Sequence, residues 1–227
     1  SDPTVAPSGK RYVQLVLVLG ALIALGPLTI DMYLPAFPAL SAELGATDSQ
    51  TQLTLTGMLA GLAFGQLLIG PLSDAFGRKR PLLLGLLTHA LASVLAALAP
   101  SIYLLAGVRV LQGFAGAAIS VVAMAIVRDL FSGYAVAKLM SRLMLVIGLA
   151  PILAPSIGGL ILQWTTWRGI FGVLAVIAVV LTVVAVLGVR ETLPVERRRP
   201  ADLGATLATY RTLLADRSFM ALVLIGG

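Results

Sequence analysis

Six long apolar segments dominate this sequence of 227 residues. A helix needs roughly 20 mostly apolar residues to cross the ~30 Å hydrocarbon core of a membrane. Runs of Leu and Ala without strict alternation favour helices over the strands of a barrel. Proline and glycine separate the segments, and Ser49, Thr51 and Ser101 are candidate helix caps. We therefore predict an all-α integral membrane protein whose six transmembrane helices lie at 12–34, 51–72, 81–99, 102–127, 139–163 and 167–188.

The composition excludes several classes of protein. Only 11% of the residues are charged, whereas soluble domains have about 25%. A soluble globule could not cover its surface with so few charges, and a disordered chain would be more polar. The chain has no cysteine and a single histidine, which leaves little for disulfides, metal sites or a nucleophilic relay. No nucleophile, base and metal ligands cluster in the sequence, so we do not expect an enzyme.

The basic residues predict the orientation of the helices. Fourteen of the 16 Lys and Arg residues lie in the N-terminal tail, in every second loop and after the last span. Arg168 is the base predicted for the opposite loops, and Arg109 lies inside the fourth span. Because basic loops stay in the cytoplasm, this pattern predicts cytoplasmic N- and C-termini. The net charge of +6 is thus explained by topology rather than by nucleic-acid binding.

The chain divides into four predicted parts. A cytoplasmic tail at 1–11 precedes a six-helix domain at 12–188. A polar linker at 189–218 contains apolar residues at helical spacing in 203–214, which is typical of an amphipathic helix on the inner leaflet. The apolar stretch 219–227 is too short to span a bilayer and reads as the cut start of a seventh helix. We therefore expect the 227 residues to be part of a longer protein.

The loop after the second span carries the order Gly-Pro-Leu-Ser-Asp-Ala-Phe-Gly-Arg-Lys-Arg at 70–80. An ordinary basic turn would explain the three bases but not this order. The loop resembles the signature loop of the major facilitator superfamily, with Ala75 where the usual pattern has an arginine. The resemblance implies two inverted three-helix repeats forming the N-terminal half of a transporter. It also implies a cytoplasmic latch against the other half, made by Gly70, Asp74, Gly77, Arg78 and Lys79.

The fourth span places a charged residue among apolar ones. Arg109, Gln112, Gly113 and Gly116 share one helix face. An arginine in the hydrocarbon region is costly and should face a cavity or a partner, unless it lies near a helix end and reaches the headgroups. The order Leu-x-x-x-Arg-x-x-Gln-Gly at 105–113 resembles the second motif of the superfamily, which implies a role in proton coupling.

The fifth span contains Pro151, Pro155, Gly158 and Gly159. Prolines and glycines bend membrane helices and permit close backbone approach, and they are also common in ordinary membrane packing. The Pro-x-x-Gly-Gly order resembles the helix-bend motif of drug:proton antiporters rather than uptake porters. Ala150 and Ala154 stand where that motif usually has glycine.

Asp31 lies near the end of the first span, in Asp-Met-Tyr-Leu-Pro. A carboxylate there either sits among the outer headgroups or faces a cavity and binds a proton or a cationic group. The run resembles the bicyclomycin and chloramphenicol resistance branch of the drug exporters, where this acid is linked to transport. The sequence Arg-Glu-Thr-Leu-Pro at 190–194 is similar to the exit of the sixth helix in the same branch.

These resemblances imply proton-coupled export of small amphipathic drugs, such as chloramphenicol-like or bicyclomycin-like antibiotics, from a bacterial inner membrane. The proton gradient would supply the energy, without a cofactor. The implied partners are the bilayer, the drug and a C-terminal six-helix half. A nutrient transporter of the same superfamily, and a half-length module that dimerises or regulates without transporting alone, are the alternatives. We expect Asp31 and Arg109 to couple protons, and the substrate to contact Asp31, Tyr33, Met58 and Gln112.

Overall fold

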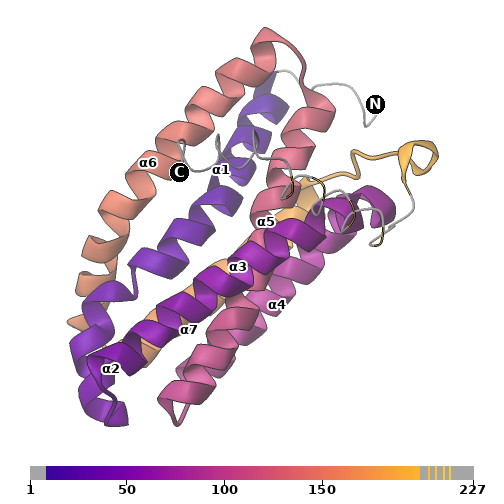
Figure 1. Ribbon diagram of the computed structural model, residues 1–227. Helices are drawn as coiled ribbons and strands as arrows, with labels where there is room; N and C mark the ends of the chain where they lie inside the picture. Colours follow the sequence, from indigo (N-terminus) through magenta and orange to yellow (C-terminus); the bar gives the residue numbers. More distant parts are fainter. Residues whose placement is uncertain (1–8, 200–203, 205–207, 209–211, 213–214, 216–227) are drawn as a thin grey trace.

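The computed structural model describes residues 9–199 together with residues 204, 208, 212 and 215. Over these residues the chain forms helices and no strands, as the sequence predicts (Figure 1). Six helical segments are long and apolar enough to cross a membrane. In chain order, the elements are α1 (Gly9–Asp31), the 3-10 helix η1 (Leu34–Ala36), α2 (Phe37–Leu44), α3 (Asp48–Phe76), α4 (Lys79–Ala97), α5 (Ile102–Leu130), α6 (Tyr134–Leu162), α7 (Trp167–Gly188) and the 3-10 helix η2 (Val195–Arg197).

The first membrane segment is longer than predicted and interrupted. The helix α1 ends at Asp31, and helical structure resumes in η1 and α2. Pro35 and Pro38, which follow the predicted first span, occupy the second positions of η1 and α2. Proline is accepted there because its missing N–H would have no partner within the helix. Asp31 therefore lies at a break within the segment.

Helix ends were predicted less well than helix positions. The cap of α3 is Thr47, not Ser49 or Thr51, because the Thr47 side chain accepts from the backbone N–H of Gln50. The Gln50 side chain in turn accepts from the backbone N–H of Thr47, which completes a capping box. Ser101 caps α5 as predicted, accepting from the N–H of Leu104. The sixth membrane helix, α7, has the predicted bounds, whereas α6 begins five residues before the predicted start.

The helices pack as two repeats of three. The helix α3 packs against α5, and α6 packs against α1 in the same way. Likewise α4 contacts α5 as α7 contacts α1, and the pairs α1–α5 and α4–α7 join the repeats. The contact pattern thus maps onto itself when α1, α3 and α4 are exchanged with α5, α6 and α7. Since each repeat crosses the membrane an odd number of times, the two repeats have opposite directions.

Glycines allow α3 and α5 to approach closely. A Cβ added at Gly61 would collide with the backbone carbonyl of Val110, and one at Gly113 would collide with that of Met58. Without a hydrophobic drive between helices in lipid, such small residues let backbones pack tightly and gain van der Waals contacts. The backbones of α3 and α5 are therefore in close contact, and α5 carries Arg109 and Gln112.

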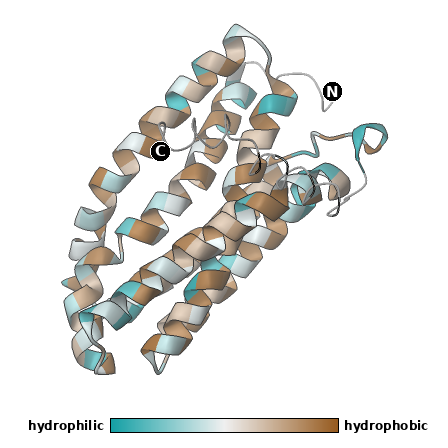
Figure 2. Ribbon diagram, in the orientation of Figure 1, coloured by the Kyte–Doolittle hydropathy of each residue, from teal (hydrophilic) through white to brown (hydrophobic). Residues whose placement is uncertain are grey.

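The outer surface suits a membrane. Figure 2 shows apolar residues along the helices and polar ones gathered at helix ends and in the segment after α7. Leu84, Leu87 and Leu91 form an exposed apolar stripe along α4. The protein is therefore a multi-pass membrane protein. The predicted amphipathic helix at 203–214 and the predicted start of a seventh helix at 219–227 lie outside the described residues, apart from the isolated positions given above.

The two ends of the bundle differ in charge. At one end, which we call the basic end, Tyr12 at the start of α1 contacts Phe131 of the α5–α6 turn, and the segment 189–199 bonds to the end of α3 and the α3–α4 turn. At the opposite end, Arg168 forms an ion pair with Glu43 at 3.1 Å and donates to the carbonyl of Ala99 at 3.2 Å. Glu43 also accepts from the Trp167 indole at 2.7 Å. Here α2, α7 and the α4–α5 turn are held together.

Candidate functional site

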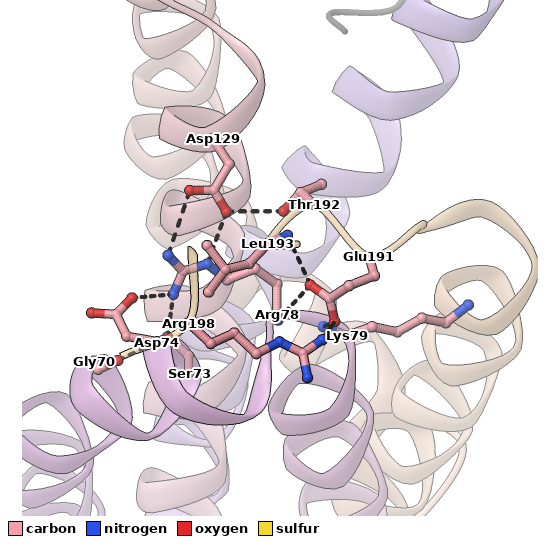
Figure 3. A network of polar contacts seen from close by, with 10 residues as sticks. All are labelled: Gly70, Ser73, Asp74, Arg78, Lys79, Asp129, Glu191, Thr192, Leu193 and Arg198. Carbon is pink, nitrogen blue, oxygen red and sulfur yellow. Dashed lines mark hydrogen bonds and ion pairs between the residues drawn. The ribbon is translucent and has the colours of Figure 1, made fainter. Parts of the chain in front are cut away.

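Arg78 is the centre of a polar network at the basic end (Figure 3). Its guanidinium donates to Oδ1 of Asp74 at 2.6 Å and to Oδ2 of Asp129 at 2.8 Å. It also donates to Oγ of Ser73 at 2.7 Å. Burial lowers the pKa of Arg78, but the hydrogen bonds with Asp129 and Asp74 outweigh burial and leave this pKa above its ordinary value. The buried charge of Arg78 is thus compensated by two carboxylates.

Glu191 caps the start of α4 from the segment after α7. Its carboxylate accepts from the backbone N–H groups of Arg78 at 2.8 Å, Lys79 at 3.2 Å and Leu193 at 3.0 Å. A carboxylate at a helix N-terminus satisfies free N–H groups and interacts favourably with the helix dipole. The turn needs Gly77, because φ is +87° and an added Cβ would approach Glu191. Glu191, in the segment after α7, therefore holds the α3–α4 turn in place.

The predicted latch residues lie together at this end. Asp74, Gly77, Arg78 and Lys79 belong to the network, and the carbonyl of Gly70 accepts from Ser73 at 2.9 Å. A pocket of about 250 Å³ opens beside them between α3 and α5, lined by Gly70, Ser73, Asp74, Arg78, Val121, Ala125, Arg128 and Asp129. The loop of the predicted latch is therefore tied to α5 and to the segment after α7.

Sequence reasoning missed three residues of this network. Asp129 pairs with Arg78, Glu191 caps α4, and Thr192 donates to Asp129 at 2.9 Å. Asp129 and Glu191 are acids in segments where bases dominate. That imbalance is the signal that could have marked them, because an acid among bases is placed to pair with one of them.

Arg109 lies inside the bundle, with no exposed surface. Its Nη1 donates to the side-chain Oε1 of Gln112 at 2.7 Å and to the backbone carbonyl of Thr29 at 3.1 Å. The guanidinium lies 4.8 Å from the ring centre of Tyr33 and 5.7 Å from that of Phe171. Within the part of the chain that the structure describes, its Nε and Nη2 have no hydrogen-bond partner. Unlike Arg78, this arginine is held by neutral groups.

Asp31 and Arg109 approach the same break in the first membrane segment. Asp31 is the half-buried last residue of α1, and Arg109 binds the carbonyl of Thr29, two residues earlier. Among the described residues, no ion pair joins Asp31 to Arg109 at 4.0 Å or less. The predicted coupling residues therefore form no ion pair in this conformation.

The other predicted substrate contacts are covered by protein. Tyr33, Met58 and Gln112 are each 1% exposed or less. The Tyr33 hydroxyl shares a hydrogen bond of 2.8 Å with Thr54, and its ring packs against Phe171. Of the four predicted contacts, only Asp31 is reached by solvent here. A substrate would reach the other three only after the helices around them separate.

The predicted helix-bend motif lies in α6, against α1. The helix runs through Pro151 and Pro155 without interruption. A Cβ added at Gly158 would collide with the carbonyl of Met32, whereas one added at Gly159 would meet nothing within 4 Å. Gly158 therefore permits the close contact between α6 and the residue that follows Asp31.

Comparison with known proteins identifies the family. Residues 18–227 match the Major Facilitator Superfamily. The chain belongs to the major facilitator superfamily. It is 46% identical over 223 residues to the uncharacterized MFS-type transporter YdgK of Bacillus subtilis (strain 168), covering 97% of this chain and 56% of that protein. It is 40% identical over 211 residues to the bicyclomycin resistance protein homolog of Haemophilus influenzae, covering 93% of this chain and 53% of that protein.

The major facilitator fold is also found by structural comparison. The crystal structure of the human organic anion transporter MFSD10 (TETRAN) superposes with a TM-score of 0.68 at 23% identity, covering 85% of this chain and 51% of that one. The resemblance to the major facilitator superfamily drawn from the sequence is confirmed. The chain spans about half the length of the curated relatives it matches.

Proposed function

We propose that this chain is the N-terminal half of a transporter, not an enzyme, that exports small amphipathic drugs in exchange for protons. Chloramphenicol-like or bicyclomycin-like antibiotics are the proposed substrates. The observation that carries this proposal is the similarity to a bicyclomycin resistance protein homolog across 93% of the chain. The run Asp-Met-Tyr-Leu-Pro at 31–35, which places Asp31 at the break in the first membrane segment, supports it.

Asp31 is the proposed site of proton exchange. A carboxylate that gains or loses charge changes its solvation energy differently in the inward-open and outward-open states, which is what coupling requires. Arg109 would stabilise the charged form of Asp31 once the two approach more closely. Tyr33, Met58 and Gln112 would contact the drug when the surrounding helices separate. The latch residues at the basic end would dock on the C-terminal half.

The proposed orientation places the basic end in the cytoplasm of a bacterial cell, with the chain in the inner membrane. The support is the concentration of Lys and Arg at that end, because basic segments are retained on the cytoplasmic side.

Substitution of Asp31 by Asn in the complete protein tests the proposal. The variant keeps the shape of the side chain but cannot exchange a proton. In energised inverted vesicles, addition of drug to the wild type should release protons from the vesicles, as reported by a pH-sensitive dye. We expect Asp31→Asn to abolish this release, while drug still binds, because the charge change that links the two fluxes is gone.

Asp48→Asn is the matched control, since it removes an exposed acid at the first residue of α3. It should leave proton release unchanged. Undiminished coupled transport in Asp31→Asn would remove Asp31 from the mechanism. Drug accumulation in cells driven by the proton gradient would instead favour an uptake transporter.

A further inference from the structure

A closed ring of hydrogen bonds links α1, α4 and α5 around the single histidine of the chain. Nε2 of His89 lies 3.0 Å from Oγ1 of Thr29. On the other side, Gln112 donates to Ser93 at 2.8 Å, and Arg109 donates to Gln112 at 2.7 Å. Arg109 closes the ring by donating to the carbonyl of Thr29. All five residues are 1% exposed or less, so water does not compete for these bonds.

The hydroxyl protons of this ring have defined places. Thr29 donates its only hydroxyl proton to the carbonyl of Leu25 at 2.6 Å. Its Oγ1 must therefore accept from His89, which assigns the ring proton to Nε2. Ser93 likewise donates to the carbonyl of His89 at 2.8 Å, and so it accepts from Gln112. His89 is thus the donor that α4 supplies to α1.

Two hydrogen bonds of the ring involve Thr29, which lies near the end of α1. The final carbonyls of a helix have no partner within it, and the carbonyl of Thr29 uses Arg109 instead. Pro27, one turn earlier, has no N–H to donate to the carbonyl of Ile23. Arg109 of α5 therefore replaces a backbone bond near the end of α1, two residues before Asp31, and His89 of α4 binds the side chain of the same threonine.

We propose that His89 is a positioning residue: it holds Thr29, and through Thr29 the end of α1 that carries Asp31. The hydroxyl of Thr182 bonds within its own helix, by donating to the carbonyl of Ala178. His89 instead bonds across helices to the turn before Asp31. The expected effect of His89 on transport rests on the proposed function, whereas its expected effect on the position of α1 does not.

A spin label next to Asp31 tests the placement of α1 directly. The 227 residues contain no cysteine, so Leu34→Cys at the exposed first residue of η1 gives this half one reactive thiol. In the complete protein, we expect Thr29→Val and His89→Leu to add a more mobile component to the spectrum of the label. His89→Gln, which keeps an N–H donor, should restore the wild-type spectrum.

Thr182→Val is the matched control, because it removes a threonine hydroxyl that bonds within its own helix. It should leave the spectrum unchanged. An unchanged spectrum in both Thr29→Val and His89→Leu would overturn the proposal, as would equal spectra for His89→Gln and His89→Leu. If Thr29→Val does not fold, the pair of His89 variants decides.

Drug-coupled proton release provides the second readout. We expect Thr29→Val to lower it about tenfold, because a buried donor loses its acceptor and Asp31 loses its fixed position. His89→Gln should retain it. A wild-type protein without coupled release would contradict the proposed export function, while the label spectra would still decide whether His89 positions α1.

Discussion

Two arginines are buried in the part of the chain that the structure describes, and their surroundings differ in charge. Arg78 at the basic end lies between two carboxylates, with nitrogen–oxygen distances of 2.6 and 2.8 Å. Arg109 inside the bundle has a carbonyl, a side-chain amide and two aromatic rings around it, and no carboxylate within ion-pair distance in the described part of the chain. The charge of Arg78 is thus neutralised by adjacent carboxylates, whereas the charge of Arg109 is not.

The difference separates stability from function. A buried charge without a counter-ion is costly, and replacing it by an apolar side chain of similar size often costs nothing. The environment of Arg109 is therefore poorly explained by stability. Arg78, in contrast, neutralises Asp74 and Asp129 and closes a network that joins α3, α5 and the segment after α7. We infer that Arg78 maintains the fold of the basic end and that Arg109 is retained for transport.

The largest expected effect on stability is that of Arg78→Met. Removal of this guanidinium leaves Asp74 and Asp129 next to one another without their shared cation, and breaking a buried pair in this way costs about 3 kcal/mol. Arg80→Met, two residues away and exposed, is the control and should change the free energy of unfolding by less than about 0.5 kcal/mol. Denaturant unfolding of the purified protein in detergent measures both. Equal effects would show that Arg78 acts only through net charge.

A smaller effect distinguishes the two acids that bind Arg78. The side chain of Asp129 is 18% exposed and accepts from both Arg78 and Thr192, whereas that of Asp74 is 47% exposed. We expect Asp129→Asn to lower the free energy of unfolding by about 1–2 kcal/mol, and Asp74→Asn by less than about 1 kcal/mol, because solvent screens the exposed pair. The same unfolding measurement tests this order. The reverse order would place the main support of Arg78 on α3 instead of α5.

The sequence predicted the residues of these networks that occur in short motifs. The order of residues 70–80 marked Asp74 and Arg78, and a charge within an apolar span marked Arg109. Asp129 and Glu191 lie 51 and 113 residues from Arg78 along the chain. Their pairing depends on how the helices pack, which no local pattern encodes.

Helix positions followed from apolar length, while several helix ends did not. The break after Asp31 escaped prediction because the apolar run continues into η1 and α2. Tyr33, Met58 and Gln112 are predicted substrate contacts, and an apolar helix in lipid carries little amphipathic signal to show which residues one conformation covers. The structure buries all three.

A small expected change in stability, and the most informative one, is that of Arg109→Met. The substitution removes the charge from the apolar interior and leaves only the carbonyl of Thr29 and the amide oxygen of Gln112 without a donor. These losses and gains offset one another, so we expect the free energy of unfolding to stay within about 1 kcal/mol of the wild type. Drug-coupled proton release should nevertheless be lost, because no cation remains to stabilise the ionised form of Asp31. Arg109→Lys keeps the charge but not the planar fork, and it should retain part of the coupling. A loss of stability as large as that of Arg78→Met would mean that both arginines serve the fold, and the contrast between the two sites would no longer separate fold from transport.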